Sequence, residues 1–218
     1  REYLGSDTAR LRLEASRQDL FPWIDEKTQV LGADRWVDRD TTLRLGGLDF
    51  QLRHVGPAHT TEDLAVFVPQ LGVLFAGDLV FQGRIPFVGQ ADSRQWIASL
   101  TQLQGIKAHV VIPGHGPVSA PWPAALGPER DYLSGLLKTA REAVAAGTFL
   151  EDVTADAEAR APADWLLTSP HARNLGKAVI ARLRAEGWAV AGVARPEAAL
   201  EGGTAAGELG VGADVTHQ

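Results

Sequence analysis

The chain has 218 residues, enough to bury a sizeable core, and its apolar and charged fractions are those of an ordinary globular protein. A formal net charge of -6 argues against binding to nucleic acid or to an anionic membrane surface. No run approaches the roughly eighteen apolar residues of a membrane span. The absence of Cys excludes disulfides and thiolate ligands, so any metal must be held by His, Asp and Glu.

The sequence begins at Arg1 and contains no Met. We therefore expect a processed product or a piece of a longer chain, with its cellular compartment left open. Ser6 precedes a charged periodic stretch, which predicts a capped helix that ends near Leu20. Polar, irregular residues then lead to two predicted strands around a turn at Gly46-Gly47, the second of which runs to about His54.

Two almost continuously apolar strands are predicted at residues 64–68 and 73–76, joined by a Pro-Gln-Leu-Gly turn. Because neither strand alternates between apolar and polar residues, we expect both to be buried on both faces of a sheet. Another short buried strand, with the sequence His-Val-Val-Ile-Pro, begins at residue 109. At least one more sheet would be needed to cover the other face of this layer, and the sequence does not supply enough strands for it.

Apolar residues at helical spacing predict three further helices, and their order relative to the strands predicts an α/β layer architecture. Thr148 and Glu151 have the spacing of a capping box for an additional short helix. Residues 189–218 are rich in Ala, Gly and Glu, and we expect a disordered tail there. The three helices are predicted at residues 93–105, 128–146 and 170–186.

Two histidines and an aspartate stand close to the ends of the predicted buried strands. His59 precedes the apolar hairpin in Gly-Pro-Ala-His-Thr, Asp78 follows it in Ala-Gly-Asp-Leu, and His115 follows the next strand in Pro-Gly-His-Gly. Loops at strand ends are where α/β proteins place their sites, and the flanking glycines allow sharp turns. Imidazole and carboxylate are suitable ligands for zinc or iron when no Cys is available. The alternative for each residue taken alone is a turn former or a satisfied polar group.

The stretch from Thr41 to Ser119 resembles the C-terminal half of the metallo-β-lactamase superfamily. The likeness rests on "GPAHTTEDLAVFVPQLGVLFAGDLVF" and "VVIPGHGPV", and within that superfamily it is most similar to zinc hydrolases associated with quinoprotein and sulfur-oxidation systems. The resemblance implies an αβ/βα sandwich, of which residues 1–188 would hold the second half and a remnant of the first. It also implies that His59 and His115 each bind one of two metal ions and that the Asp78 carboxylate bridges them.

The chief signature of that superfamily, His-x-His-x-Asp-His, is not in this sequence. We expect this motif to lie N-terminal to Arg1 in the intact protein, and the alternative is a natural pseudo-enzyme that has lost it. Catalytic zinc usually has three protein ligands and a water. The chain by itself is therefore expected to bind metal weakly and to turn over little substrate.

In the intact protein, the resemblance implies two zinc ions, or iron or manganese in their place, and metal-assisted hydrolysis of an ester, thioester or amide in a small-molecule substrate. A hydroxide activated by the two metals would attack the carbonyl. Asp63 is a candidate to orient His59 or its loop, the alternative being a simple loop carboxylate. Arg84 and His171 are candidates to contact substrate, the alternatives being a solvated loop arginine and a surface histidine.

Other functions remain open from the sequence. A class B β-lactamase is one, although many of those enzymes carry Cys where this chain has Asp78, and a nearby Lys where it offers only Arg84. A non-catalytic fragment or pseudo-enzyme acting as an interaction module is another. A nucleic-acid-processing member fits poorly with the acidic charge, and the residues do not fix the oligomeric state.

Overall fold

The structure is a computed structural model that describes residues 6–29, 31–88, 93–117, 120–155, 157–193 and 212–216. The chain divides into two compact units, one of residues 1–37 and 192–211 and one of residues 38–191 and 212–218. The first unit contains α1 (Asp7–Asp19), which Ser6 caps by accepting a hydrogen bond from the backbone of Ala9, as predicted. None of the described helices is long and apolar enough to cross a membrane.

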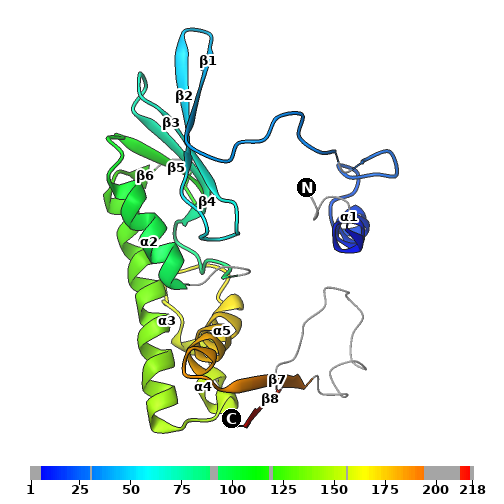
Figure 1. Ribbon diagram of the computed structural model, residues 1–218, viewed down its shortest axis with the longest axis vertical. Coiled ribbons are helices and arrows are strands. Elements are labelled where there is room, and N and C mark those ends of the chain that lie inside the picture. Colours follow the sequence, from blue (N-terminus) through cyan, green and yellow to red (C-terminus); the bar gives the residue numbers. More distant parts are fainter. Residues whose placement is uncertain are drawn as a thin grey trace. The chain divides into compact units, whose positions relative to one another are not determined.

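A six-stranded sheet dominates the second unit, in the order β1-β2-β3-β4-β5-β6 (Figure 1). All neighbouring strands are antiparallel except β4 and β5, which are parallel and connected through α2 (Ser93–Gln104). The predicted hairpin turn at Gly46-Gly47 is confirmed, since both glycines have positive φ between β1 and β2. The strands are β1 (Thr41–Leu45), β2 (Leu48–His54), β3 (Leu64–Val68), β4 (Val73–Phe81), β5 (Val110–His115) and β6 (Ala120–Pro121).

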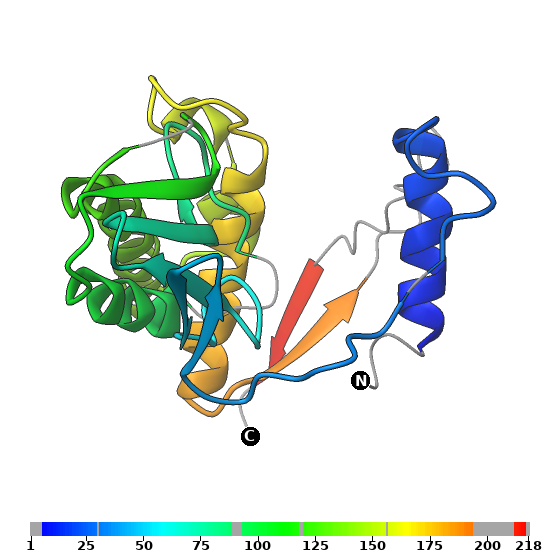
Figure 2. The ribbon, with the colours of Figure 1, turned by 90° about the horizontal axis from the view of Figure 1, so that it is seen from above.

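One face of the sheet is buried beneath α2 and α3 (Gly127–Ala146), which run side by side (Figure 2). A lateral row on this face joins Phe67, Leu74 and Val111, which are paired across β3, β4 and β5 and are all buried. They share one core cluster with Trp96 of α2 and Leu133 of α3. The apolar stripe predicted for the long helix therefore faces the core, as expected from its helical spacing.

The opposite face of the sheet is apolar but only partly covered. Leu52, Val66, Phe75 and Ile112 are paired in one lateral row across β2 to β5, and none of the four is buried. Phe75 is 45% exposed. The prediction that both apolar strands are buried on both faces is therefore wrong, since Val66 of β3 is only partly buried and Phe75 of β4 is exposed. The expectation that this face needs a further layer agrees with the exposure.

The remaining helices pack as a second layer against the long helix. The α5 helix (Pro170–Ala185) lies against α3, and α4 (Leu150–Thr154) contacts α5. The predicted capping box before α4 is wrong, because the helix begins after Phe149 and no side chain caps it. Two short 3₁₀ helices, Ala124–Leu126 and Glu158–Arg160, complete the connections.

The predicted disordered tail falls mostly outside the described residues. Within residues 189–218, the structure describes β7 (Ala189–Val193) and β8 (Gly212–Thr216), which pair in a two-stranded sheet. The intervening residues 194–211 lie outside the described ranges.

Candidate metal centre

His59 stands in the loop between β2 and β3, and Asp63 shapes that loop. The Asp63 carboxylate accepts hydrogen bonds from the backbone N–H of Ala58 and of Thr60, at 3.1 and 2.8 Å, and from the Thr60 hydroxyl at 2.8 Å. These three bonds hold the backbone on both sides of His59. Asp63 therefore fixes the backbone of the loop that carries His59, and its role in orienting a metal ligand stays a prediction.

The His59 side chain is only 16% exposed, and its ring packs among aromatic residues from α2, from β4 and from the loop after β4. Its centroid lies 5.4 Å from that of Trp96 on α2, 5.8 Å from Phe81 on β4 and 6.5 Å from Phe87. The buried Nδ1 atom has no hydrogen-bond partner in the described structure. Because the ring is fixed by packing, Nε2 is the nitrogen that faces Asp78.

Asp78 lies within β4 rather than just beyond a strand as predicted, because β4 continues through the buried residues Leu79 to Phe81. Gly77 has a φ of +52°, and the register with β5 shifts on both sides of it. Gly114 of β5 leaves the space that Asp78 occupies. A Cβ atom at Gly114 would collide with the Asp78 carboxylate and would lie 2.6 Å from the carbonyl carbon of Gly77.

His115 is the last residue of β5 and therefore lies at the strand end rather than past it. Its ring stacks on Phe81 with centroids 4.8 Å apart, and its backbone carbonyl accepts a hydrogen bond from Gln82 N–H at 2.9 Å. Gly116, with a φ of +108°, is required here because a Cβ atom would collide with Gln82.

The three predicted metal ligands meet at the Asp78 carboxylate. His59 Nε2 lies 3.6 Å from Asp78 Oδ2, and His115 Nε2 lies 3.4 Å from Asp78 Oδ1. Both distances exceed the usual 2.7–3.2 Å of a hydrogen bond. Two ligands of one tetrahedral zinc ion, each about 2.0–2.2 Å from the metal, lie roughly 3.3 Å apart. The donor set and spacing therefore fit a carboxylate that shares one metal with each imidazole.

The described residues do not complete either half of such a site. Among them, no group of three or more His, Asp or Glu side chains is arranged to hold a metal ion unaided. Each imidazole forms a separate pair with Asp78, which gives two protein donors per pair, whereas catalytic zinc usually has three.

Arg84 contacts His115 directly, a contact that the sequence did not predict. Its Nη1 lies 3.2 Å from His115 Nδ1, and its guanidinium carbon lies 5.7 Å from the centre of the Phe81 ring. Since a guanidinium only donates hydrogen bonds, His115 Nδ1 must accept, and the imidazole proton of the neutral ring is on Nε2. In this arrangement Arg84 holds His115 in the tautomer that carries its proton toward Asp78.

Two further residues are more buried than the sequence suggests. His171, expected at the surface or lining a pocket, is only 8% exposed and lines a cavity beside α3. Glu129, which the sequence analysis missed, is fully buried on α3 and accepts a hydrogen bond from Phe81 N–H at 3.2 Å. Burial, and secondarily the negative charge of Asp78, raises the pKa of Glu129 well above its usual value. Its position in an acidic first helical turn is typical of an exposed residue and gave no signal of burial.

The sequence is similar to members of one known protein superfamily. A sequence profile described as the Metallo-beta-lactamase superfamily matches residues 6–115, half of the chain. Metallo-beta-lactamase IND-1 of Chryseobacterium indologenes is 31% identical over 77 residues, which cover 33% of this chain and 32% of the relative. Metallo-beta-lactamase type 2 of Bacteroides fragilis is 29% identical over 80 residues, covering 34% and 32%. The chain thus spans about a third of the length of these curated relatives.

Solved structures support the fold over more of the chain. A metallo-beta-lactamase family protein from Thermus thermophilus aligns with a TM-score of 0.58 at 17% identity, covering 87% of this chain and 64% of that one. The sec-alkylsulfatase Pisa1 from Pseudomonas sp. aligns with a TM-score of 0.52 at 16% identity, covering 72% and 27%. At these identities the likeness concerns the fold alone, and it confirms the predicted α/β class.

Proposed function

This chain belongs to the metallo-beta-lactamase superfamily, and we propose that it carries part of the dinuclear metal centre of a hydrolase. One observation carries the proposal. The two oxygens of Asp78 each face a different imidazole, at separations that suit two ligands of one metal ion. We take zinc as the metal, because imidazole and carboxylate are among its ordinary ligands.

In the proposed centre, residues of this chain supply metal ligands and fix the positions of those ligands. His59 would hold one ion through Nε2, and Asp78 would hold both through its two carboxylate oxygens. His115 would hold the other ion through Nε2 once Arg84 has moved away and the ring proton has passed to Nδ1. Zinc, when bound, supplies Lewis acidity and lowers the pKa of water toward neutrality. Asp63 keeps the His59 loop in place, and the aromatic packing around His59 excludes water from one side of the site.

The proposed substrate is a small molecule with an ester, thioester or amide carbonyl. Arg84 is the described cation that touches the centre, through His115. A substrate carboxylate placed beside it would draw the guanidinium away from His115 Nδ1 and form a charge-assisted hydrogen bond instead. Substrate binding would then also release His115 from its contact with Arg84.

A β-lactam is the second candidate substrate, because the two curated relatives named above are metallo-beta-lactamases and one is 31% identical over the aligned 77 residues. Arg84 would then contact the carboxylate of the antibiotic. Turnover of nitrocefin by the full-length gene product, measured beside turnover of a p-nitrophenyl ester and of an acyl thioester, separates the two candidates.

Zinc binding is the direct test. The chain is stripped with chelator, titrated with zinc in a calorimeter, and compared with Asp78→Asn and with Asp131→Asn, which removes an exposed carboxylate on α3 that is not a candidate ligand. We expect Asp78→Asn to weaken zinc binding at least tenfold and Asp131→Asn to leave it unchanged. Equal binding by all three proteins would refute the bridging role. Elemental analysis of the full-length gene product should find two zinc ions per chain, and finding none would refute the hydrolase proposal.

A further inference from the structure

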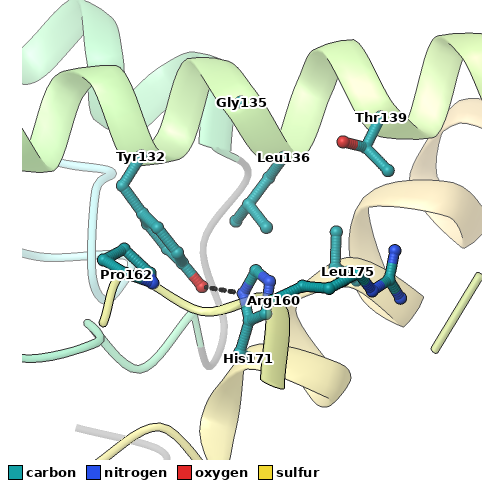
Figure 3. Close-up of a pocket in the computed structure, with 8 residues that line it drawn as sticks. All are labelled: Tyr132, Gly135, Leu136, Thr139, Arg160, Pro162, His171 and Leu175. Carbon is teal, nitrogen blue, oxygen red and sulfur yellow. Dashed lines mark hydrogen bonds between the residues drawn. The ribbon is translucent and has the colours of Figure 1, made fainter. Parts of the chain in front are cut away.

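A cavity separate from the candidate metal centre opens between α3, α5 and the segment that precedes α5 (Figure 3). Its volume is about 410 Å³, which is in the range of pockets for small molecules. All of its lining residues belong to the second unit of the chain. They are Tyr132, Gly135, Leu136, Thr139, Arg160, Pro162, His171 and Leu175.

A chain of hydrogen bonds determines which nitrogen of His171 carries the proton. Asn174 Oδ1 accepts from Val88 N–H at 3.1 Å and its Nδ2 donates to the Pro86 carbonyl at 2.7 Å, which settles the orientation of the amide. The same Nδ2 donates to the Tyr132 hydroxyl at 3.1 Å. That hydroxyl has one proton, and its remaining partner is His171 Nδ1 at 2.9 Å.

We assign Tyr132 as the donor to His171 Nδ1, because this gives the hydroxyl proton its one described acceptor; the dashed line in Figure 3 marks this contact. Burial raises the pKa of Tyr132 to about 12, so its hydroxyl keeps its proton at neutral pH. With Nδ1 accepting, the neutral His171 ring carries its proton on Nε2. The cavity is thus lined by a histidine whose second nitrogen is fixed as a hydrogen-bond donor.

The other polar groups of the lining also favour a negative partner. Arg160 is a permanent cation whose Nη2 donates to the carbonyls of Val153 and Ala155, which anchors the guanidinium at one end of the cavity. Burial and then the positive charge of Arg160 lower the pKa of His171, so the two groups are electrostatically coupled. No acidic side chain is among the described lining residues, and Thr139 adds a hydroxyl.

The rest of the lining is apolar. Leu136, Leu175, Pro162 and the face of the Tyr132 ring contribute the hydrophobic surface. His171 also lies in the first turn of α5, where the helix dipole favours negative charge. A ligand that matches both halves of this lining has one anionic group and a compact apolar body.

We propose that this cavity is a binding site for a small organic carboxylate. The carboxylate oxygens would accept from His171 Nε2–H and from Arg160, and the apolar part would lie against Leu136 and Leu175. The proposal does not depend on the metal centre, since none of the lining residues is a candidate metal ligand. The hydrogen bonds of Asn174 to Pro86 and Val88 nevertheless connect the site to the loop that follows β4 and carries Arg84.

The probe is phenylacetate, titrated into chelator-treated protein with ¹⁵N-labelled histidine and followed by NMR of the imidazole nitrogens. We expect saturable shifts at His171, with Nε2 protonated before and after binding. The neutral isostere phenylacetamide is expected to bind about tenfold more weakly, because it lacks a charge-assisted hydrogen bond. Inorganic phosphate, which lacks the apolar body, is expected to bind weakly as well.

Variants of the lining complete the test. Arg160→Gln is expected to weaken phenylacetate binding about tenfold. Because Arg160 also holds two carbonyls, Tyr132→Phe provides a second test that leaves them intact. Without the hydroxyl donor, either ring nitrogen of His171 can carry the proton, which the imidazole nitrogen shifts would report. Phenylacetate binding should weaken a few-fold. Lys138→Gln, which removes an exposed charge elsewhere on α3, is the matched control and should bind normally.

Three outcomes would overturn the proposal. Equal binding of phenylacetate and phenylacetamide would mean that the cavity recognises only apolar shape. Preference for inorganic phosphate would mean that the apolar lining has no role in recognition. An absence of shifts at His171 with phenylacetate in the tens of millimolar range would mean that the cavity is not a carboxylate site.

Discussion

Replacement of Glu129 by Gln should stabilise the chain at neutral pH and have little effect in acid. Glu129 is fully buried, one of its oxygens accepts from Phe81 N–H, and the other has no partner among the described atoms. Burial raises its pKa well above the ordinary 4.5 of an unfolded glutamate. Gln keeps the shape and the acceptor for Phe81 but has no proton to lose.

The sign and slope of the effect follow from proton linkage. Between pH 4.5 and the raised pKa, the folded chain holds one proton more than the unfolded chain, so its stability falls as the pH rises. The slope is about 1.4 kcal/mol per pH unit for one proton. The Gln variant lacks this loss, while every other titrating group contributes equally to both proteins and cancels in the comparison.

The assay is urea unfolding of both proteins from pH 4 to 8 in the presence of chelator. At pH 4 the two free energies of unfolding should agree within about 1 kcal/mol, since both side chains are neutral and similarly bonded. Above pH 4.5 the free energy of unfolding of the variant should increase steadily relative to that of the parent. For Glu142→Gln, an exposed change on the same helix, the free energy of unfolding should vary with pH in parallel with that of the parent. Parallel curves for Glu129→Gln as well would refute the raised pKa.

Three other substitutions test the site and the core. Arg84→Met should strengthen zinc binding to this chain several-fold in calorimetry, because His115 Nδ1 is then free to carry the proton and leave Nε2 for the metal; unchanged or weaker binding would contradict that role. Gly114→Ala should destabilise the chain by about 1–3 kcal/mol in urea, since the new methyl group collides with Asp78 and the Gly77 backbone, and neutral behaviour would contradict the close approach. Leu133→Ala, in the centre of the core, should cost about 2–5 kcal/mol in thermal or urea unfolding, and a loss below about 1 kcal/mol would contradict its burial.

Much of this architecture follows from periodicity in the sequence. Helical spacing located the long helix and its buried stripe, and Gly46-Gly47 located the first hairpin. The glycines beside Asp78 and His115 marked two of the segments that meet at the candidate site. The motif likeness pointed to the same three residues. Local signals were sufficient for these three residues because each lies in, or just before, a strand of the same sheet.

The parts that escaped prediction depend on contacts between distant segments. His171 is buried because Tyr132, 39 residues earlier, bonds to its ring, and nothing near His171 in the sequence indicates that partner. Glu129 faces a backbone N–H of β4, 48 residues away. The contact between Arg84 and His115 similarly joins two segments that only the parallel pairing of β4 and β5 brings together.

In the proposed centre, the partly covered face of the sheet would link metal affinity to folding. Phe75, which is half exposed on that face, and Asp78, the proposed bridge between two ions, are three residues apart on β4. A layer packed over Phe75 would bury apolar area, worth about 25 cal/mol per Å², and would restrict the motion of the strand that holds the carboxylate. Ion binding and closure of the sandwich would then reinforce each other as one cooperative equilibrium. A layer that covers the sheet would increase the metal affinity of the proposed centre without contacting a metal ligand.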